Sequence, residues 1–230
     1  MNGTNGSGAT LQVTEIFKSI QGESTWAGLP CGFVRLTGCP LRCAYCDTTY
    51  AYDGGTEMKI GEILEACAAL DVPMIEVTGG EPLAQANCPV LVDCLLQDGY
   101  TVLVETSGAL PINKVSADAI RIMDIKCPGS GMADRMDWAN IERLTERDEV
   151  KFVIADRADY EWSRDVIQKF DLPSRCRQIL MSPFTNAGQP PSAVGLNPGD
   201  VVKWMLQDGL KARFQLQLHK QIWPPEQRGV

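Results

Sequence analysis

Short runs rich in Val and Ile alternate along this chain with stretches whose apolar residues recur at helical spacing. The predicted strands cover residues 32–37, 73–78, 101–106, 119–125, 150–154, 178–181 and 212–218. The predicted helices cover residues 59–70, 89–97, 159–170 and 198–209. Strands that alternate with helices are joined by crossover connections and therefore run parallel in one sheet. The pattern predicts an α/β fold, either an open doubly wound sheet or a complete or partial barrel.

Both architectures place functional residues beyond the carboxyl ends of the strands. The segments that follow the predicted strands are therefore candidates for a functional site. They are residues 38–46, 79–82, 107–108, 126–128, 182–183 and His219.

The composition is that of a globular protein, because 44% of the 230 residues are hydrophobic and can form one sizeable core. We expect a disordered tail over the polar, Gly-rich residues 1–10 and a single domain over residues 11–230. The net charge is −8, from 29 acidic and 21 basic residues, and no basic cluster occurs. This balance argues against nucleic-acid binding. No apolar stretch approaches the roughly 20 residues that a membrane helix needs, so we expect no membrane contact.

Nine cysteines are an odd number, which favours a reducing cytoplasm over a secreted disulfide framework. Cys39, Cys43 and Cys46 directly follow the first predicted strand with the spacing C-x3-C-x2-C. Three soft thiolates so close together indicate ligands of zinc or of an iron–sulfur cluster rather than inert buried thiols. A closed zinc site needs a fourth ligand, which Cys31 could supply. A three-cysteine [4Fe–4S] site would instead leave one iron open for chemistry.

The cysteine loop, with Tyr45 directly before its last cysteine, resembles the signature of the radical S-adenosylmethionine superfamily. The sequence GGEP at residues 79–82 is similar to the glycine-rich cofactor motif of that superfamily. The resemblance implies a partial, TIM-like (β/α) barrel of about six parallel strands. It also implies that three cysteines bind three irons of a [4Fe–4S] cluster while S-adenosylmethionine chelates the fourth. The reduced cluster would then cleave this cofactor to a 5′-deoxyadenosyl radical.

Further segments resemble one family within that superfamily, the 7-carboxy-7-deazaguanine synthases. They are QGE at residues 21–23, FVR at 33–35, CDT at 46–48, ETSG at 105–108 and QLQLHKQIW at 215–223. The resemblance extends from Glu15 to Trp223, and Ser24 departs from it because the family commonly has glycine there. It implies conversion of 6-carboxy-5,6,7,8-tetrahydropterin to 7-carboxy-7-deazaguanine with release of ammonia. This carbon–nitrogen lyase reaction belongs to deazapurine biosynthesis, which supplies the queuosine base of tRNA.

The family resemblance also assigns roles to individual residues. The residues implied to contact the pterin are Ile20, Gln21, Gly22, Glu23, Arg35, Thr78 and His219. Those implied to contact S-adenosylmethionine are Tyr45, Cys46, Asp47, Gly80, Asp124, Ile125 and Lys126. Thr48 is implied as a ligand of Mg²⁺, a hard cation that prefers oxygen donors. A planar guanidinium suits Arg35 to the substrate carboxylate, and His219 would approach the pterin from the last strand.

Two other interpretations remain open on the sequence. A glycyl-radical-activating enzyme shares the cysteine loop but acts on a protein, and a structural zinc or iron–sulfur module would use Cys31 as its fourth ligand. The synthase interpretation implies a flavodoxin or ferredoxin as electron donor and a cytoplasmic location. A homodimer is the commonest arrangement of such enzymes. We assign no role to the residues after Trp223.

Overall fold

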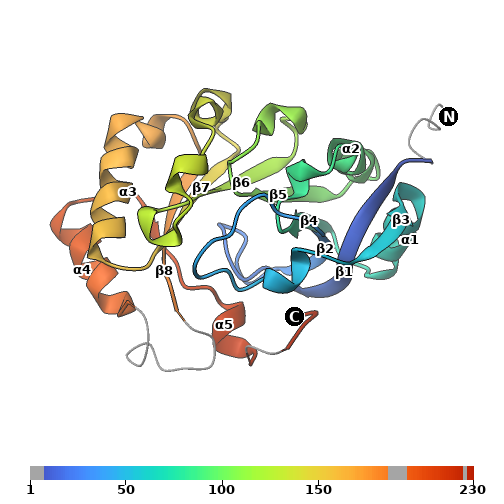
Figure 1. The fold of residues 1–230 in the computed structure, drawn as a ribbon, viewed down its shortest axis with the longest axis horizontal. Helices are drawn as coiled ribbons and strands as arrows, with labels where there is room; N and C mark the ends of the chain where they lie inside the picture. The colour runs from blue at the N-terminus through green and yellow to red at the C-terminus, as the bar shows by residue number, and fades with distance from the viewer. Residues whose placement is uncertain (1–7, 186–195, 225–226) are drawn as a thin grey trace.

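The described strands form one sheet with the order β3-β1-β2-β4-β5-β6-β7-β8-β9 (Figure 1). The computed structural model describes residues 8–185, 196–224 and 227–230. Its strands are β1 (Thr10–Ile20), β2 (Pro30–Leu36), β3 (Thr56–Lys59), β4 (Met74–Gly79), β5 (Thr101–Thr106), β6 (Ile120–Ile125), β7 (Glu149–Ile154), β8 (Gln178–Pro183) and β9 (Arg213–Phe214). Its helices are α1 (Ile60–Ala69), α2 (Cys88–Gln97), α3 (Arg157–Lys169), α4 (Pro198–Gln207) and α5 (His219–Ile222).

The strands β2 and β4 to β9 run parallel, each beside the next. Strand β1 pairs antiparallel with β2, and β3 pairs antiparallel with β1. The predicted parallel α/β sheet is therefore confirmed. The sheet is open, since β3 and β9 at its two ends are not paired with each other within the described residues. A partial barrel, rather than a closed one, is the correct alternative.

Three predictions about the ends of the chain need correction. Strands β1 and β3 were not expected, because the predicted strands were continuous apolar runs of the kind that parallel sheets bury on both faces. Strand β1 instead alternates buried residues such as Leu11 and Val13 with more exposed ones. The expected tail over residues 1–10 is too long, since Thr10 already pairs with Lys59; residues 1–7 lie outside the described part. The strand expected over 212–218 is limited to β9.

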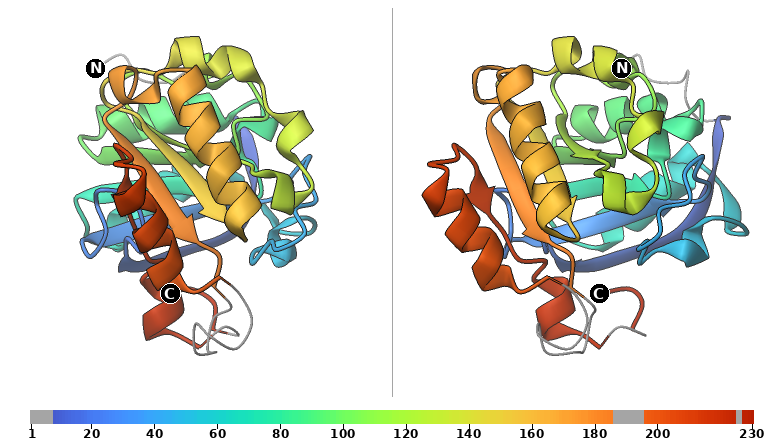
Figure 2. Two further views of the ribbon diagram at one scale, coloured as in Figure 1. Left: turned by 90° about the vertical axis from the view of Figure 1, so that its left-hand side faces the viewer. Right: turned by 60° about the vertical axis from the view of Figure 1, so that its left-hand side comes forward.

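Helices α1 to α4 cover the outer face of the curved sheet (Figure 2). The outward side chains of the strands, such as Val34, Val77 and Phe152, pack beneath these helices in the main core. No helix in the described ranges is long and apolar enough to cross a membrane. The helices thus act as a rigid support for the inner face of the sheet.

The inner face is apolar toward the amino ends of the parallel strands. A second core cluster lies there, with Phe17 and Trp26 packed against it; its members are Cys31, Phe33, Met74, Leu103, Ile120 and Ile122. Polar and charged side chains replace these residues toward the carboxyl ends of the same strands. The apolar cluster therefore closes one end of the partial barrel and leaves the other end for a site.

Candidate active site

A cavity of about 1070 Å³ opens at the carboxyl ends of the parallel strands. Loops after β1, β2, β4 and β5 line it together with α5 and the last residues of the chain. Sites for a single small molecule reach about 1,000 Å³ at most, so this cavity is large enough for a cofactor and a substrate together. All residues predicted to contact the pterin line it: Ile20, Gln21, Gly22, Glu23, Arg35, Thr78 and His219.

The cysteine loop forms one wall of this cavity. Cys39, Cys43 and Cys46 line the cavity and are partly buried. The loop is held in shape from within, because Arg42 donates hydrogen bonds of 2.7 Å to the carbonyls of Cys39 and Leu41. The three predicted cluster ligands therefore face one shared space.

The GGEP turn after β4 supports this loop from the side. A Cβ on Gly80 would lie 2.5 Å from the carbonyl oxygen of Gly38 and 2.7 Å from Cys39 Cβ. The backbone N–H of Glu81 donates to the same carbonyl at 2.8 Å. Glycine is needed here because the turn touches the start of the cysteine loop. Gly80 also lines the cavity, as expected for a residue that contacts a cofactor.

The donor set fits an iron–sulfur cluster. Burial raises the pKa of the Cys39 and Cys43 thiols, and the nearby Lys126 ammonium opposes that increase. Among the described residues, no three Cys, His, Asp or Glu side chains are gathered closely enough to hold a single metal ion. A [4Fe–4S] cluster is larger than one ion, and each thiolate binds a different iron.

Cys31 does not belong to the cysteine loop in space. It lies near the start of β2, fully buried in the apolar cluster, whereas the loop follows the end of that strand. Leu36 lies five positions along the extended strand from Cys31, a length of roughly 16 Å. The four-cysteine site is therefore ruled out by position.

Most residues predicted to contact S-adenosylmethionine also lie beside the cysteine loop. Tyr45, Cys46, Asp47, Asp124 and Lys126 line the cavity, and Lys126 Nζ pairs with Asp124 Oδ2 at 2.8 Å. Ile125 is the exception, since its side chain is buried in the main core beneath the helices. Any ligand contact from Ile125 would therefore use its backbone. Thr48 lines the cavity as well, and its hydroxyl donates to Asp47 Oδ1 at 3.0 Å.

The segment after β1 forms the opposite wall. Gln21 is buried there, and its amide nitrogen donates to the carboxyl of Glu76 on β4. The amide oxygen of Gln21 accepts from the backbone N–H of Glu23 at 3.1 Å. Ser24 follows with φ +62°, a left-handed conformation that glycine adopts more easily. Such a conformation explains why glycine is common at position 24. The Ser24 hydroxyl in this chain accepts from the backbone N–H of Trp26 at 3.1 Å.

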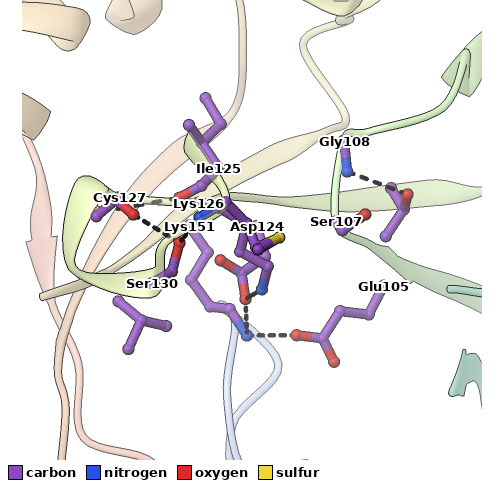
Figure 3. Close-up of polar contacts among 12 residues, drawn as sticks. Glu105, Ser107, Gly108, Asp124, Ile125, Lys126, Cys127, Ser130 and Lys151 are labelled. Atoms are coloured by element: carbon purple, nitrogen blue, oxygen red, sulfur yellow. Dashed lines mark hydrogen bonds and ion pairs between the residues drawn. The ribbon is translucent and has the colours of Figure 1, made fainter. Parts of the chain in front are cut away.

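Charged side chains from β5, β6 and β7 also line the cavity. The buried ammonium of Lys151 on β7 pairs with Glu23 at 2.8 Å. It also pairs with Asp124 at 3.5 Å and with Glu105 of β5, as Figure 3 shows. Burial alone would raise the pKa of Glu23, but Lys151 and His219 lower it to about 2. Burial and the nearby Glu105 raise the pKa of Glu76 to about 8, although Gln21 and Lys151 oppose this increase. At pH 7 the Glu23 carboxylate is therefore charged, whereas the Glu76 carboxyl is largely protonated.

Arg35 occupies the cavity wall beside two aromatic rings. Its Nε donates to Glu15 Oε1 at 2.7 Å, and the hydroxyl of Tyr50 donates to the same oxygen at 2.9 Å. Its guanidinium carbon lies 5.7 Å from the Phe17 ring centre and 5.8 Å from that of Tyr50. Glu15 is its only hydrogen-bond partner in the described part of the chain, so its terminal nitrogens can bind an anion.

Helix α5 closes the cavity between the two walls. His219 begins this helix, so the expectation that it lies on a last strand is wrong, although it does reach the cavity. Lys220 Nζ pairs with Asp47 Oδ2 at 2.7 Å, which connects the helix to the cysteine loop. Trp223 and Arg228 also line the cavity, and Arg228 lies 4.1 Å from the Tyr50 ring centre.

Several residues of the cavity were not predicted: Tyr50, Glu76, Glu105, Lys151, Lys220 and Arg228. A signal for Glu76, Glu105 and Lys151 was present, because each is a charged residue in a mainly apolar strand. No local pattern marked Tyr50 or Arg228, whose place depends on the folded path of the chain.

Comparison with known proteins places this geometry in a family. Residues 33–170 match the family model of the radical SAM superfamily. The 7-carboxy-7-deazaguanine synthase of Koribacter versatilis is 42% identical over 96% of this chain and all of its own length. The synthase of Chlorobaculum tepidum is 45% identical over 96% of this chain and 98% of its own. The chain belongs to the 7-carboxy-7-deazaguanine synthase family.

The structures agree with this membership at the level of the fold. QueE from Escherichia coli superimposes with a TM-score of 0.75 and 21% identity, covering 95% of this chain and all of that chain. This chain is therefore a radical S-adenosylmethionine enzyme. Enzymes of this class use a [4Fe–4S] cluster and S-adenosylmethionine. Membership of this family excludes the two alternative interpretations of the sequence, namely a glycyl-radical-activating enzyme and a structural metal module.

Proposed function

We propose that this protein converts 6-carboxy-5,6,7,8-tetrahydropterin to 7-carboxy-7-deazaguanine with loss of ammonia. The proposal rests on one observation: two segments that are far apart in the sequence line the same cavity. Residues 20–23 at the end of β1 and His219 at the start of α5 line the same space as the three cysteines of the loop. The relatives that match this chain along its length bear the name of that synthase.

The cysteine side of the cavity is proposed to hold the cofactors. Cys39, Cys43 and Cys46 would bind the [4Fe–4S] cluster, which together with S-adenosylmethionine supplies a 5′-deoxyadenosyl radical. Tyr45, Asp47, Gly80, Asp124 and Lys126 would contact S-adenosylmethionine with their side chains or backbone, as would Cys46 and the backbone of Ile125. These residues adjoin the cysteines or line the wall beside them.

The opposite side is proposed to hold the pterin. Arg35 would bind the carboxylate of the substrate through its free terminal nitrogens, beside the ring of Tyr50. Ile20, Gln21, Gly22, Glu23, Thr78 and His219 would contact the pterin ring. The substrate hydrogen that is removed would lie on C6, and ring contraction with loss of ammonia would follow.

Thr48 is proposed as a protein ligand of Mg²⁺. Thr48 lines the cavity two residues after Cys46. Magnesium commonly binds one or two protein oxygens together with substrate oxygens and water, so a single threonine can serve with the substrate carboxylate. The cation would then hold that carboxylate in a fixed orientation.

The cavity is also suited to exclude water from a radical reaction. Helix α5 is connected to both walls, since Lys220 pairs with Asp47 and the backbone N–H of Leu218 donates to the Gly22 carbonyl at 2.9 Å. The wider context remains part of the proposal. We infer one domain with both ends at the substrate site, a cytoplasmic location, a homodimer, and a flavodoxin or ferredoxin as electron donor.

An anaerobic turnover assay tests the proposed function. Protein with a reconstituted cluster is incubated with dithionite, S-adenosylmethionine, Mg²⁺ and the carboxytetrahydropterin, and products are followed by mass spectrometry. The proposal predicts 5′-deoxyadenosine together with 7-carboxy-7-deazaguanine. Deoxyadenosine without the deazaguanine would contradict the substrate assignment. Omission of Mg²⁺ should lower the rate, and a Thr48→Val variant should require more Mg²⁺ to reach its own maximum.

A further inference from the structure

Lys151 lies outside every sequence motif of the chain, yet its ammonium lies between carboxylates of three separate elements. Its Nζ is 2.8 Å from Glu23 Oε2. It is also 3.5 Å from Asp124 Oδ2 and pairs with Glu105 (Figure 3). Only 3% of the Lys151 side chain is exposed. A buried charge is costly unless it is paired, so this arrangement is a specific one.

The three carboxylates come from both sides of the cavity. Glu23 belongs to the wall where we place the pterin, whereas Asp124 belongs to the wall of S-adenosylmethionine and also pairs with Lys126. Glu105 lies between them at the end of β5. One ammonium therefore connects the substrate segment, β5 and β6 from its place on β7.

The pairing leaves part of Glu105 available to a ligand. Its Oε1 pairs with Lys151, while its Oε2 accepts from the Thr78 hydroxyl at 3.4 Å. The Glu105 side chain is 28% exposed, and it lines the cavity. Lys151 thus fixes one oxygen of Glu105 and directs the other toward a residue of the proposed pterin site.

We propose that Lys151 is a positioning residue for the pterin. Its ion pairs fix the positions of Glu23 and Glu105 relative to Asp124. The substrate wall and the cofactor wall are thereby held at a fixed distance from each other. This role rests on the proposed function, because the pterin is the ligand that the arrangement serves. A residue that merely stabilised the fold would affect both ligands alike.

Binding measurements without turnover separate these two roles. The variants Lys151→Met and Lys151→Arg are prepared anaerobically with a reconstituted cluster, and calorimetry measures their affinities for the carboxytetrahydropterin and for S-adenosylmethionine without reductant. Loss of the charged hydrogen bonds in Lys151→Met should weaken pterin binding by at least about tenfold. Affinity for S-adenosylmethionine should fall much less, because Asp124 keeps its closer ion pair with Lys126 at 2.8 Å. Lys151→Arg should be intermediate for the pterin, because a guanidinium keeps the charge but not the geometry.

A matched control removes a different ion pair. Arg143 pairs with Asp137 at 2.7 Å away from the cavity, so Arg143→Met should lower the melting temperature without changing either affinity. Wild-type affinity for the pterin in Lys151→Met, or equal weakening of both ligands, would overturn the proposal. If Lys151→Met does not fold, Lys151→Arg decides: wild-type affinity for the pterin in that variant would overturn it.

Hydrogen exchange tests the role of Lys151 without relying on the proposed substrate. In protein without ligands, backbone amides of residues 20–24 should exchange faster in both Lys151 variants than in the wild type and Arg143→Met. If wild-type protein binds no pterin, the proposed function fails and the pterin role with it. Unchanged exchange at residues 20–24 would instead show that Lys151 does not hold this segment, whatever the ligand.

Discussion

Gly22 and His219, nearly 200 positions apart, are in direct contact. A Cβ on Gly22 would lie 2.4 Å from His219 Nδ1 and 3.2 Å from the backbone nitrogen of His219. The first turn of α5 therefore packs directly on the segment that follows β1. The two ends of the chain form one wall of the cavity together, and glycine at position 22 is required for this contact.

Gly22→Ala should separate these two segments. The added methyl group cannot fit beside His219, so α5 should move and the KM for the pterin should rise by about tenfold or more. Iron content should stay normal, because the cysteine loop is untouched. Gly61→Ala is the control: a Cβ there meets nothing within 4 Å, and alanine favours the helix by about 0.5–1 kcal/mol. A normal KM in Gly22→Ala would refute the contact.

Cys31→Ala and Cys46→Ala should differ in their iron content. Cys46 lines the cavity with the other two loop cysteines, whereas Cys31 is packed in the apolar cluster at the opposite end of β2. We expect Cys46→Ala to lose the cluster and Cys31→Ala to retain it with a small loss of stability. Iron and sulfide analysis with absorption spectra provides the measurement. Loss of iron in Cys31→Ala would restore the four-cysteine alternative.

Arg35→Lys should impair binding of the substrate carboxylate. A lysine ammonium cannot reproduce a two-pronged contact, and a lost charged hydrogen bond costs about 1.5–3 kcal/mol, or roughly a tenfold to hundredfold rise in KM. An analogue that lacks the carboxylate provides the comparison. Arg35→Lys and the wild type should bind tetrahydropterin equally weakly. A difference that persists with this analogue would mean that Arg35 acts elsewhere.

Glu76 should make stability depend on pH. Its pKa in the folded protein is raised from 4.5 to about 8, so the folded state binds more protons than the unfolded state between these values. Its contribution to the free energy of unfolding is complete below about pH 4.5 and decreases as pH rises toward 8. Denaturant titrations from pH 5 to 8 should show this decrease, and Glu76→Gln should reduce it. An identical slope in Glu76→Gln would contradict the prediction.

The sequence was sufficient to predict the parallel sheet and the two loops that carry the cysteines and the GGEP turn. The apolar runs of β4 to β8 mark strands buried on both faces. Such strands can be predicted without knowing which strands lie beside them. The cysteine loop and the GGEP turn keep their spacing within a few residues of chain. The position of such a short motif relative to its strand is fixed by spacing along the chain. The positions of Cys39 and Gly80 at the strand ends could therefore be predicted.

The remaining features depend on contacts between distant parts of the chain. Strand β1 is half-buried and polar on one side, so its pattern was not distinguished from a loop. Glu76 and Lys151 are visible as charges in apolar strands, but their partners follow from strand order and register. The position of His219 on α5 rather than on a strand follows from its contact with Gly22. Long-range packing of this kind has no signal in a local window of sequence.

Transfer of a labelled hydrogen tests the central claim most directly. Carboxytetrahydropterin with deuterium at C6 is incubated anaerobically with the reduced, cluster-loaded protein and unlabelled S-adenosylmethionine. We predict that the deuterium appears in 5′-deoxyadenosine while 7-carboxy-7-deazaguanine accumulates. Unlabelled 5′-deoxyadenosine with no deazaguanine would contradict the proposed reaction at this site.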